Sequence, residues 1–93
     1  MARRRYLIAY DICDDRRLRR TFTLMKGYGT PLQYSIFLCD LSEREKLRWE
    51  ADIRDIMDVG VDSVISVEIG TAGTEVSVIG APRRFPPGGP MIV

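Results

Sequence analysis

The chain has 93 residues, enough for one compact domain but too few for two independent hydrophobic cores. Hydrophobic residues make up 45% and charged residues 29%, as in an ordinary globular protein, and the lack of histidine excludes Ser-His and Cys-His catalysis and His-ligated zinc. The net charge is only +1, but residues 1–20 hold seven arginines against three aspartates, an asymmetry that favours a polyanionic partner.

The two cysteines and the apolar runs indicate the compartment. Cys13 and Cys39 form no CxxC pair, so we expect reduced thiols rather than a disulfide framework or a zinc ribbon. No apolar run approaches the roughly 20 residues of a membrane span. The run Tyr6–Tyr10 after the basic N-terminus is too short for a signal peptide. We therefore expect a cytoplasmic protein with no membrane partner.

The first half of the chain predicts a strand and then a helix. Residues 6–10 are β-prone and apolar, and this buried strand ends at Asp11. A helix over residues 14–27 follows, with Asp14 or Asp15 as its N-cap. Its apolar stripe comprises Leu18, Phe22 and Met25.

The second half predicts further strands around one more helix. The extended stretch 32–41 is long for one strand, and a turn near Tyr34 and Ser35 would divide it. Ser42 and Glu45 form a capping box that opens a helix over residues 42–58. On this helix the spacing predicts the exposed pairs Glu43–Lys46 and Glu50–Arg54 and a core stripe of Trp49, Ile53, Ile56 and Met57. Strands are predicted after it over residues 63–69 and 75–79.

The element order indicates the fold class. With the long stretch divided, the order β-α-β-β-α-β-β is an α+β ferredoxin-like βαββαβ sandwich with an extra C-terminal strand. We expect one domain over residues 1–80 and a Pro/Gly-rich tail over 81–93, whose last strand would pair with the partner protomer. A strand beyond a complete sheet needs an edge to pair with, and a homodimer supplies one.

Asp11 is the first candidate for a functional residue, because the apolar strand ends at this charged side chain and aspartate is disfavoured in strands. As a functional residue it would ligate a hard divalent ion such as Mg²⁺ or Mn²⁺. The alternative is a turn former whose side chain bonds backbone amides. Asp14 and Asp15 would add carboxylates to such a site or, alternatively, cap the helix.

The other candidates also have two interpretations each. Arg16, Arg19, Arg20 and Lys26 share one sector of the first helix, where they would contact phosphates or form a solvated face. Ser35 has no histidine to activate it and is expected to hydrogen-bond within the sheet. Aromatic rings such as Tyr34 and Phe37 would stack on bases or, alternatively, pack in the core.

Three segments together resemble the CRISPR-associated protein two family, which comprises small proteins of the spacer-acquisition machinery. They are YDICDDRRLRR from Tyr10, KGYG from Lys26 and QYSIF from Gln33. The resemblance covers roughly residues 5–80 and is specific as a combination. This chain departs from the family pattern just before QYS: many relatives carry a basic residue there, whereas this chain has Pro31 and Leu32.

The resemblance implies a ferredoxin-like homodimer with Asp11 as the catalytic residue and metal ligand, facing its two-fold mate across the interface. Mg²⁺ would be the cofactor, with Mn²⁺ as the alternative. It also implies a metal-dependent endonuclease acting on single-stranded RNA or double-stranded DNA, and a DNA-binding scaffold for CRISPR integrase dimers. Nucleic acid would contact Arg16, Arg17, Arg19, Arg20 and Lys26, and Tyr10, Ser35 and Phe37 would support the site.

The alternative function is a purely non-catalytic dimeric scaffold. In that case the basic face and the basic N-terminus bind DNA, and Asp11 has no role in cleavage. A small-molecule-binding ferredoxin-like domain ranks behind both, since no phosphate-cradling glycine loop is present.

Overall fold

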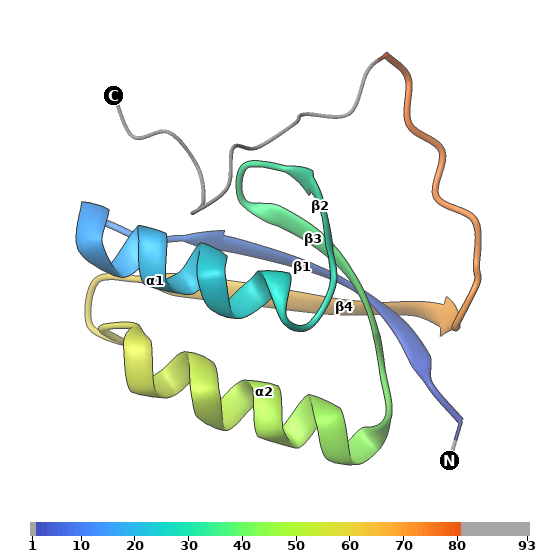
Figure 1. Cartoon of the computed structure of the whole chain (residues 1–93), viewed down its shortest axis with the longest axis horizontal. Helices are drawn as coiled ribbons and strands as arrows, with labels where there is room; N and C mark the ends of the chain where they lie inside the picture. Colours follow the sequence, from blue (N-terminus) through green and yellow to red (C-terminus); the bar gives the residue numbers. More distant parts are fainter. Residues whose placement is uncertain (1, 81–93) are drawn as a thin grey trace.

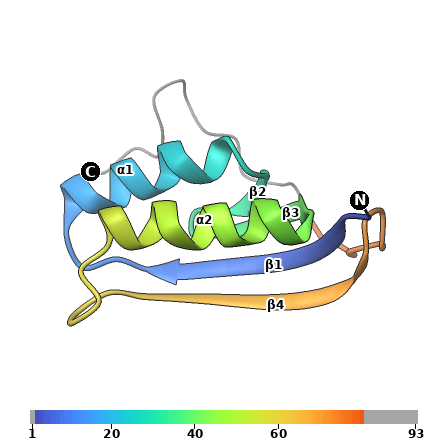
Figure 2. The ribbon, with the colours of Figure 1, turned by 90° about the horizontal axis from the view of Figure 1, so that it is seen from below.

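The computed structural model describes residues 2–80. In chain order its elements are β1 (Arg4–Asp11), α1 (Asp15–Lys26), β2 (Thr30–Gln33), β3 (Ile36–Leu41), α2 (Glu43–Ile56) and β4 (Ser63–Thr71). The strands form one layer, and both helices lie on the same face of it (Figures 1 and 2). Within residues 2–80 the opposite face of the sheet carries no helix, and we call it the open face.

The sheet topology confirms the predicted fold class. The strands are hydrogen-bonded in the order β2-β3-β1-β4, and every neighbouring pair is antiparallel. With a helix after β1 and another after β3, this is the βαββαβ ferredoxin-like arrangement. β1 is a central strand and ends at Asp11, so the sheet itself fixes the position of that residue.

Helix α1 begins where its cap dictates. The Asp14 carboxylate accepts a hydrogen bond from the backbone N–H of Arg17 at 2.9 Å, which satisfies a donor that the first turn leaves unpaired. At the other end the N–H of Gly27 donates to the carbonyl of Leu24 at 3.0 Å. The predicted range 14–27 is therefore one residue too long at each end, because both end residues are caps.

Helix α2 carries the predicted capping box. The N–H of Glu45 donates to Ser42 Oγ at 3.1 Å, and the N–H of Ser42 donates to the Glu45 carboxylate at 2.8 Å. The helix ends at Ile56 rather than at residue 58, because Met57 already has extended backbone angles.

The ion pairs predicted along α2 are replaced by a different one. Instead of Glu43–Lys46 and Glu50–Arg54, Lys46 Nζ donates to the Glu50 carboxylate at 3.0 Å. The ammonium group also lies 5.0 Å from the ring centroid of Tyr6 and 5.4 Å from that of Trp49. Attraction to these two rings draws Lys46 toward the sheet and away from Glu43.

The long extended stretch divides at Tyr34 and Ser35, as predicted, into β2 and β3. β2 begins at Thr30, two residues earlier than expected. The chain enters β2 at Gly29, where a Cβ would collide with Cys39 Sγ and the Leu38 carbonyl oxygen. Only glycine permits so close an approach of the two strands.

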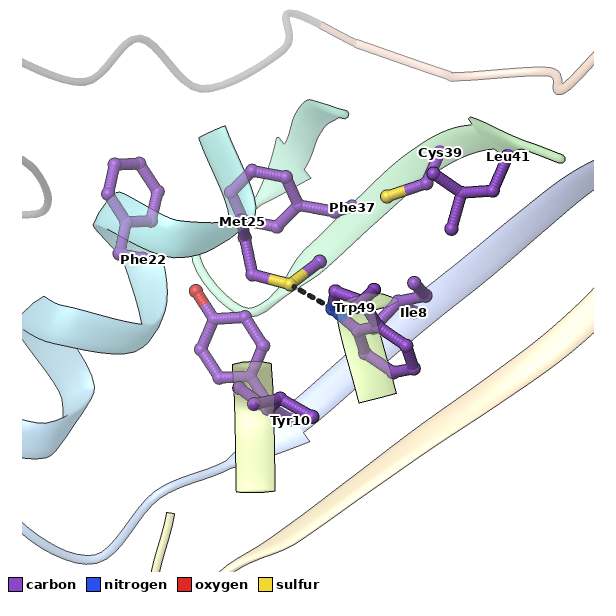
Figure 3. Close-up of a cluster of buried hydrophobic side chains, with 9 residues drawn as sticks. Ile8, Tyr10, Phe22, Met25, Phe37, Cys39, Leu41 and Trp49 are labelled. Carbon is purple, nitrogen blue, oxygen red and sulfur yellow. Dashed lines mark hydrogen bonds between the residues drawn. The ribbon is translucent and has the colours of Figure 1, made fainter. Parts of the chain in front are cut away.

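The core lies between the helices and the sheet (Figure 3). Phe22 meets Phe37 edge-on with ring centroids 5.4 Å apart, and Trp49 Nε1 donates to Met25 Sδ at 3.0 Å. The predicted helical stripes are confirmed at their centres, where the side chains are buried. Toward their ends Leu18 and Ile56 are only half-buried. The buried cluster comprises Ile8, Tyr10, Phe22, Met25, Phe37, Cys39, Leu41, Trp49 and Ile53.

The strand predicted over residues 75–79 is wrong for the single chain. β4 continues to Thr71, and Thr74 N–H then closes a turn onto the Thr71 carbonyl at 3.1 Å. The following residues join no strand within the described part of the chain. An extended segment without an edge to pair with is not stable as a strand. The predicted tail over 81–93 and its last strand lie outside the described residues.

Neither helix within residues 2–80 is both long enough and apolar enough to span a membrane.

Candidate functional site

Asp11 ends β1 at the end of the sheet where the connection from α2 enters β4 (Figure 1). Its Cα pairs with that of Ser63, and both residues are exposed. Side chains alternate along a strand and Tyr10 is buried in the core, so Asp11 lies with Ala9 on the open face. Within residues 2–80 no hydrogen bond or ion pair engages the Asp11 carboxylate, and the residue is exposed.

Tyr10, the residue before Asp11, joins the end of β1 to the β2–β3 turn. Its hydroxyl donates to the Tyr34 carbonyl at 3.0 Å, and its N–H donates to the Ser35 carbonyl at the same distance. Burial raises the pKa of the Tyr10 hydroxyl above its ordinary value, so the group stays protonated and acts as a donor. The structure therefore places Ser35 near the strand end through its backbone.

Phe37 packs in the core rather than facing the exterior. It is fully buried, and its ring stacks on Tyr10 with centroids 6.2 Å apart. The base-stacking alternative for Phe37 is therefore wrong, because no base can reach the ring. Tyr34, on the turn, is 37% exposed.

A basic face runs along the exposed side of α1, which starts beside the end of β1 (Figure 1). We define it by the four exposed side chains that share this side of the helix, Arg16, Arg19, Arg20 and Lys26. No arginine of this face forms an ion pair within residues 2–80. Residues three and four apart are neighbours on a helix, so the face presents adjacent positive charges to one ligand.

Arg17 differs from its neighbours on α1. Its Nε and Nη2 donate to the two carboxylate oxygens of Asp62 at 2.8 and 3.2 Å. The Asp62 side chain is 0% exposed, and it also accepts from the N–H groups of Cys13 and Asp58, each at 2.8 Å. The Arg17 guanidinium, followed by the Cys13 amide, holds the pKa of Asp62 well below its usual range.

The sequence prediction grouped Arg17 with the nucleic-acid-binding arginines and missed Asp62. The structure separates Arg17 from the basic face by turning it toward the connection before β4. The one signal in the sequence is that Arg17 falls outside the helical sector that the other basic residues of this helix share. Its partner, 45 positions away, leaves no local pattern.

A single described chain offers a divalent metal one unpaired carboxylate at this end of the sheet, that of Asp11. Within residues 2–80 no three Asp, Glu or Cys side chains cluster as a ligand set. Asp14 is occupied as the N-cap of α1. One chain therefore offers a single carboxylate, and Mg²⁺ is commonly held by one or two carboxylates with several waters. Two copies of Asp11 meeting at an interface would satisfy that requirement.

The opposite end of β1 holds an open depression with little free charge. Its lining includes Arg3, Asp40, Glu45 and Tyr28. Arg3 binds the Glu45 carboxylate at 2.9 and 3.0 Å, which lowers the pKa of Glu45 to about 2. Burial, followed by a hydrogen bond to a carboxylate, raises the pKa of Tyr28 to about 12. Both carboxylates that line this depression, those of Asp40 and Glu45, are already paired with arginines.

Comparison with known sequences identifies relatives of this chain. A family model described as CRISPR associated protein Cas2 matches residues 4–75. CRISPR-associated endoribonuclease Cas2 3 of Synechocystis sp. is 38% identical over 95% of this chain and 97% of its own length. CRISPR-associated endoribonuclease Cas2 2 of Thermodesulfovibrio yellowstonii is 36% identical over 89% of this chain and 90% of its own length.

Solved structures give the same result for the fold. A hypothetical protein from Thermus thermophilus superposes with a TM-score of 0.76 and 33% identity, over 88% of this chain and 96% of that one. Cas2 of Streptococcus pyogenes, crystallised at pH 6.5, superposes with a TM-score of 0.72 and 26% identity, over 82% of this chain and 99% of that one. The resemblance found in the sequence motifs is thereby confirmed.

Proposed function

This chain belongs to the CRISPR-associated protein Cas2 family, and we propose that it is a divalent-metal-dependent endonuclease of CRISPR spacer acquisition, working in the cytoplasm. One observation carries the proposal: Asp11 is an exposed, unpaired carboxylate at the end of a buried central strand, beside the basic face of α1. Single-stranded RNA and double-stranded DNA are the candidate substrates.

We propose that the active form is a homodimer joined through the open face. Ile65 and Val67 on this face are 60% and 52% exposed, and their register partners Ala9 and Leu7 lie beside them. An apolar sheet face of this kind favours burial against a second copy. Because Asp11 shares the open face, a two-fold axis through it would bring two Asp11 carboxylates together.

The chain's own residues have separate tasks in this mechanism. The Asp11 pair would hold Mg²⁺, or Mn²⁺ in its place, and this ion supplies Lewis-acid activation of water and charge compensation at the phosphate. Tyr10 fixes the backbone of the strand end through its bonds to the β2–β3 turn. Arg16 and Arg20 would bind the flanking phosphates and orient the scissile one.

Replacing Asp11 by Asn tests the proposal. The side chain keeps its size but loses the charge that binds the metal, so cleavage should fall to the level seen with chelator. The assay uses labelled single-stranded RNA and double-stranded DNA with Mg²⁺. Asp55→Asn, at an exposed carboxylate on α2, is the matched control and should cleave like the wild type. Equal cleavage by wild type and Asp11→Asn would assign the activity to a contaminant and contradict the proposal.

A second candidate function is a DNA-binding scaffold that docks CRISPR integrase dimers. It is favoured by the basic face, whose arginines are exposed and outside any ion pair in the described chain. Duplex binding should then weaken with salt, with a slope set by the number of phosphates contacted.

Two triple variants distinguish a specific effect of the basic face on DNA binding from a general effect of net charge. Changing Arg16, Arg19 and Arg20 to Gln should reduce the slope of log affinity against log salt by about three. Changing the three exposed arginines of α2 instead alters the net charge equally and should leave the slope near the wild-type value. The α2 set is Arg44, Arg48 and Arg54. Equal losses in both triple variants would contradict a specific surface on α1.

A further inference from the structure

We infer that Asp62 is a positioning residue for Asp11, because its buried carboxylate clamps the loop after β1 onto the turn before β4. We call this arrangement the Asp62 clamp; it consists of Asp62, the Arg17 guanidinium and the N–H groups of Cys13 and Asp58. The inference rests on the proposed role of Asp11 as a metal ligand and adds a residue for which the sequence motifs gave no role.

The clamp brackets the strand pair that contains Asp11. Asp11 lies opposite Ser63 in the β1–β4 register, and Asp62 is the residue directly before Ser63. On the other strand Cys13, two residues after Asp11, donates its N–H to Asp62 Oδ1 at 2.8 Å. Cys13 Sγ also lies 3.0 Å from the Val61 carbonyl oxygen. The chain leaving Asp11 is thus fixed, within two residues, to the turn before β4.

The clamp also fixes the turn from which β4 starts. Asp58 N–H donates to Asp62 Oδ2 at 2.8 Å, and Asp62 N–H donates back to the Asp58 carbonyl at 2.7 Å. One carboxylate therefore joins three segments: the loop after β1, the first turn of α1 through Arg17, and the turn after α2. The Asp62 carboxylate is shielded from water, so the loss of any partner leaves a hydrogen bond of a buried charge unsatisfied, and this penalty holds the three segments in place.

The same network holds the one arginine of α1 that lies outside the basic face. Arg17 lies six positions after Asp11, and its guanidinium is held by Asp62 in a two-point contact. Asp62 thereby joins the first turn of α1 to the loop that follows Asp11.

The opposite end of β1 supplies a matched control. Arg5 Nε and Nη2 donate to the two oxygens of Asp40, both at 2.7 Å, with the side chains 17% and 35% exposed. This pair resembles Arg17–Asp62 in geometry but lies at the far end of the strand from Asp11. A purely structural contribution of such a pair should appear in both places, and an effect on metal binding should appear at one.

The experiment compares Asp62→Asn with Asp40→Asn in the full-length chain. Mn²⁺ affinity is measured by titration calorimetry, and RNA cleavage is measured against Mg²⁺ concentration. In Asp62→Asn we expect the Mn²⁺ dissociation constant and the half-saturating Mg²⁺ concentration to rise by about ten-fold or more, the range typical of groups that orient metal ligands. Asp40→Asn should leave both values near wild type, although it lowers the melting temperature.

A second variant keeps the test decisive if Asp62→Asn fails to fold. Arg17→Lys retains the positive charge but loses the two-point contact, so it weakens the clamp without leaving a buried charge alone. It should raise the same two metal concentrations, and circular dichroism shows whether each variant is folded.

The outcomes separate the inference from the proposed function. Wild-type metal dependence in a folded Asp62→Asn or Arg17→Lys variant would overturn the inference and leave the proposed function intact. Equal rises in Asp62→Asn and Asp40→Asn would also overturn it, since the effect would then follow stability alone. A wild type that binds no Mn²⁺ would overturn the proposed function, and the inference with it.

Discussion

The two ends of β1 are both crossed by arginine–carboxylate pairs, but water reaches them differently. At the first end Arg4 binds Glu68, and these side chains are 45% and 44% exposed. At the last end Arg17 binds Asp62, whose side chain is 0% exposed. Exposed pairs contribute little because water screens them, whereas a buried carboxylate cannot lose its partner without penalty. Of these two pairs, only Arg17–Asp62 should therefore hold its surroundings firmly in place.

The ends also differ in what is left unpaired. At the first end the described structure pairs Glu45, Glu68 and Asp40, each with an arginine. At the last end Asp62 takes the Arg17 guanidinium, and Asp11 is left without a cation among residues 2–80. The contrast is therefore between an end of β1 whose carboxylates are paired and an end where Asp11 lies exposed beside a paired one.

The largest effect should come from the core that supports the Asp11 end. Phe37→Ala removes a fully buried ring that contacts Tyr10 and Phe22, and the cavity left should lower the free energy of unfolding by about 3–5 kcal/mol. Urea denaturation measures the loss. A decrease below about 1 kcal/mol would show that this end is not held by packing.

The next effect is a change in the response to acid. The pKa of Asp62 is lower in the folded chain than in the unfolded chain, so its ionisation stabilises the fold above about pH 4. That stabilisation is lost as the pH falls toward the lowered pKa. The melting temperature of Asp62→Asn should therefore fall less steeply than that of the wild type between about pH 5 and pH 2.

Part of the acid response should remain in that variant. The pKa values of Glu45 and Asp40 are also lowered, chiefly by hydrogen bonds from Arg3 and Arg5, and both pairs are intact in Asp62→Asn. Melting curves followed by circular dichroism at several pH values give the two slopes. Parallel slopes for wild type and variant would mean that Asp62 is not the carboxylate that titrates with folding.

A smaller effect should follow the loss of one hydrogen bond at the strand end. Tyr10→Phe removes the hydroxyl that donates to the Tyr34 carbonyl but keeps the ring in the core. The free energy of unfolding should decrease by about 1 kcal/mol, the usual contribution of such a bond. Denaturant titration measures it, and a loss as large as that of Phe37→Ala would contradict a role limited to one bond.

The smallest effect should lie at the exposed end. Glu68→Gln removes the partner of Arg4 in a pair that is nearly half exposed, so stability should change by less than about 1 kcal/mol. High salt should reduce the difference further because exposed charges are screened. A loss comparable to that of Phe37→Ala would break the contrast between the two ends.

The sequence by itself determined the local features. The pair Asp14 and Asp15, one of which had to be the N-cap, and the Ser42–Glu45 capping box predicted the helix starts, because a cap acts on its own first turn. The abrupt end of the strand at Asp11, and the split at Tyr34 and Ser35, were likewise visible in residue types alone. These signals depend on neighbours a few positions apart.

Only the tertiary structure decided the long-range partners. Arg17 reads like the other arginines of α1, and its separation from the basic face depends on Asp62, 45 positions later. The contact between the Lys46 ammonium group and the Tyr6 ring likewise joins α2 to β1 across 40 positions of the chain. The segment after β4 pairs with no strand within residues 2–80, although its residue types predicted a strand, because strand pairing depends on a partner that local residue types do not specify. Burial and charge pairing are properties of the packed chain, so no local pattern specifies them.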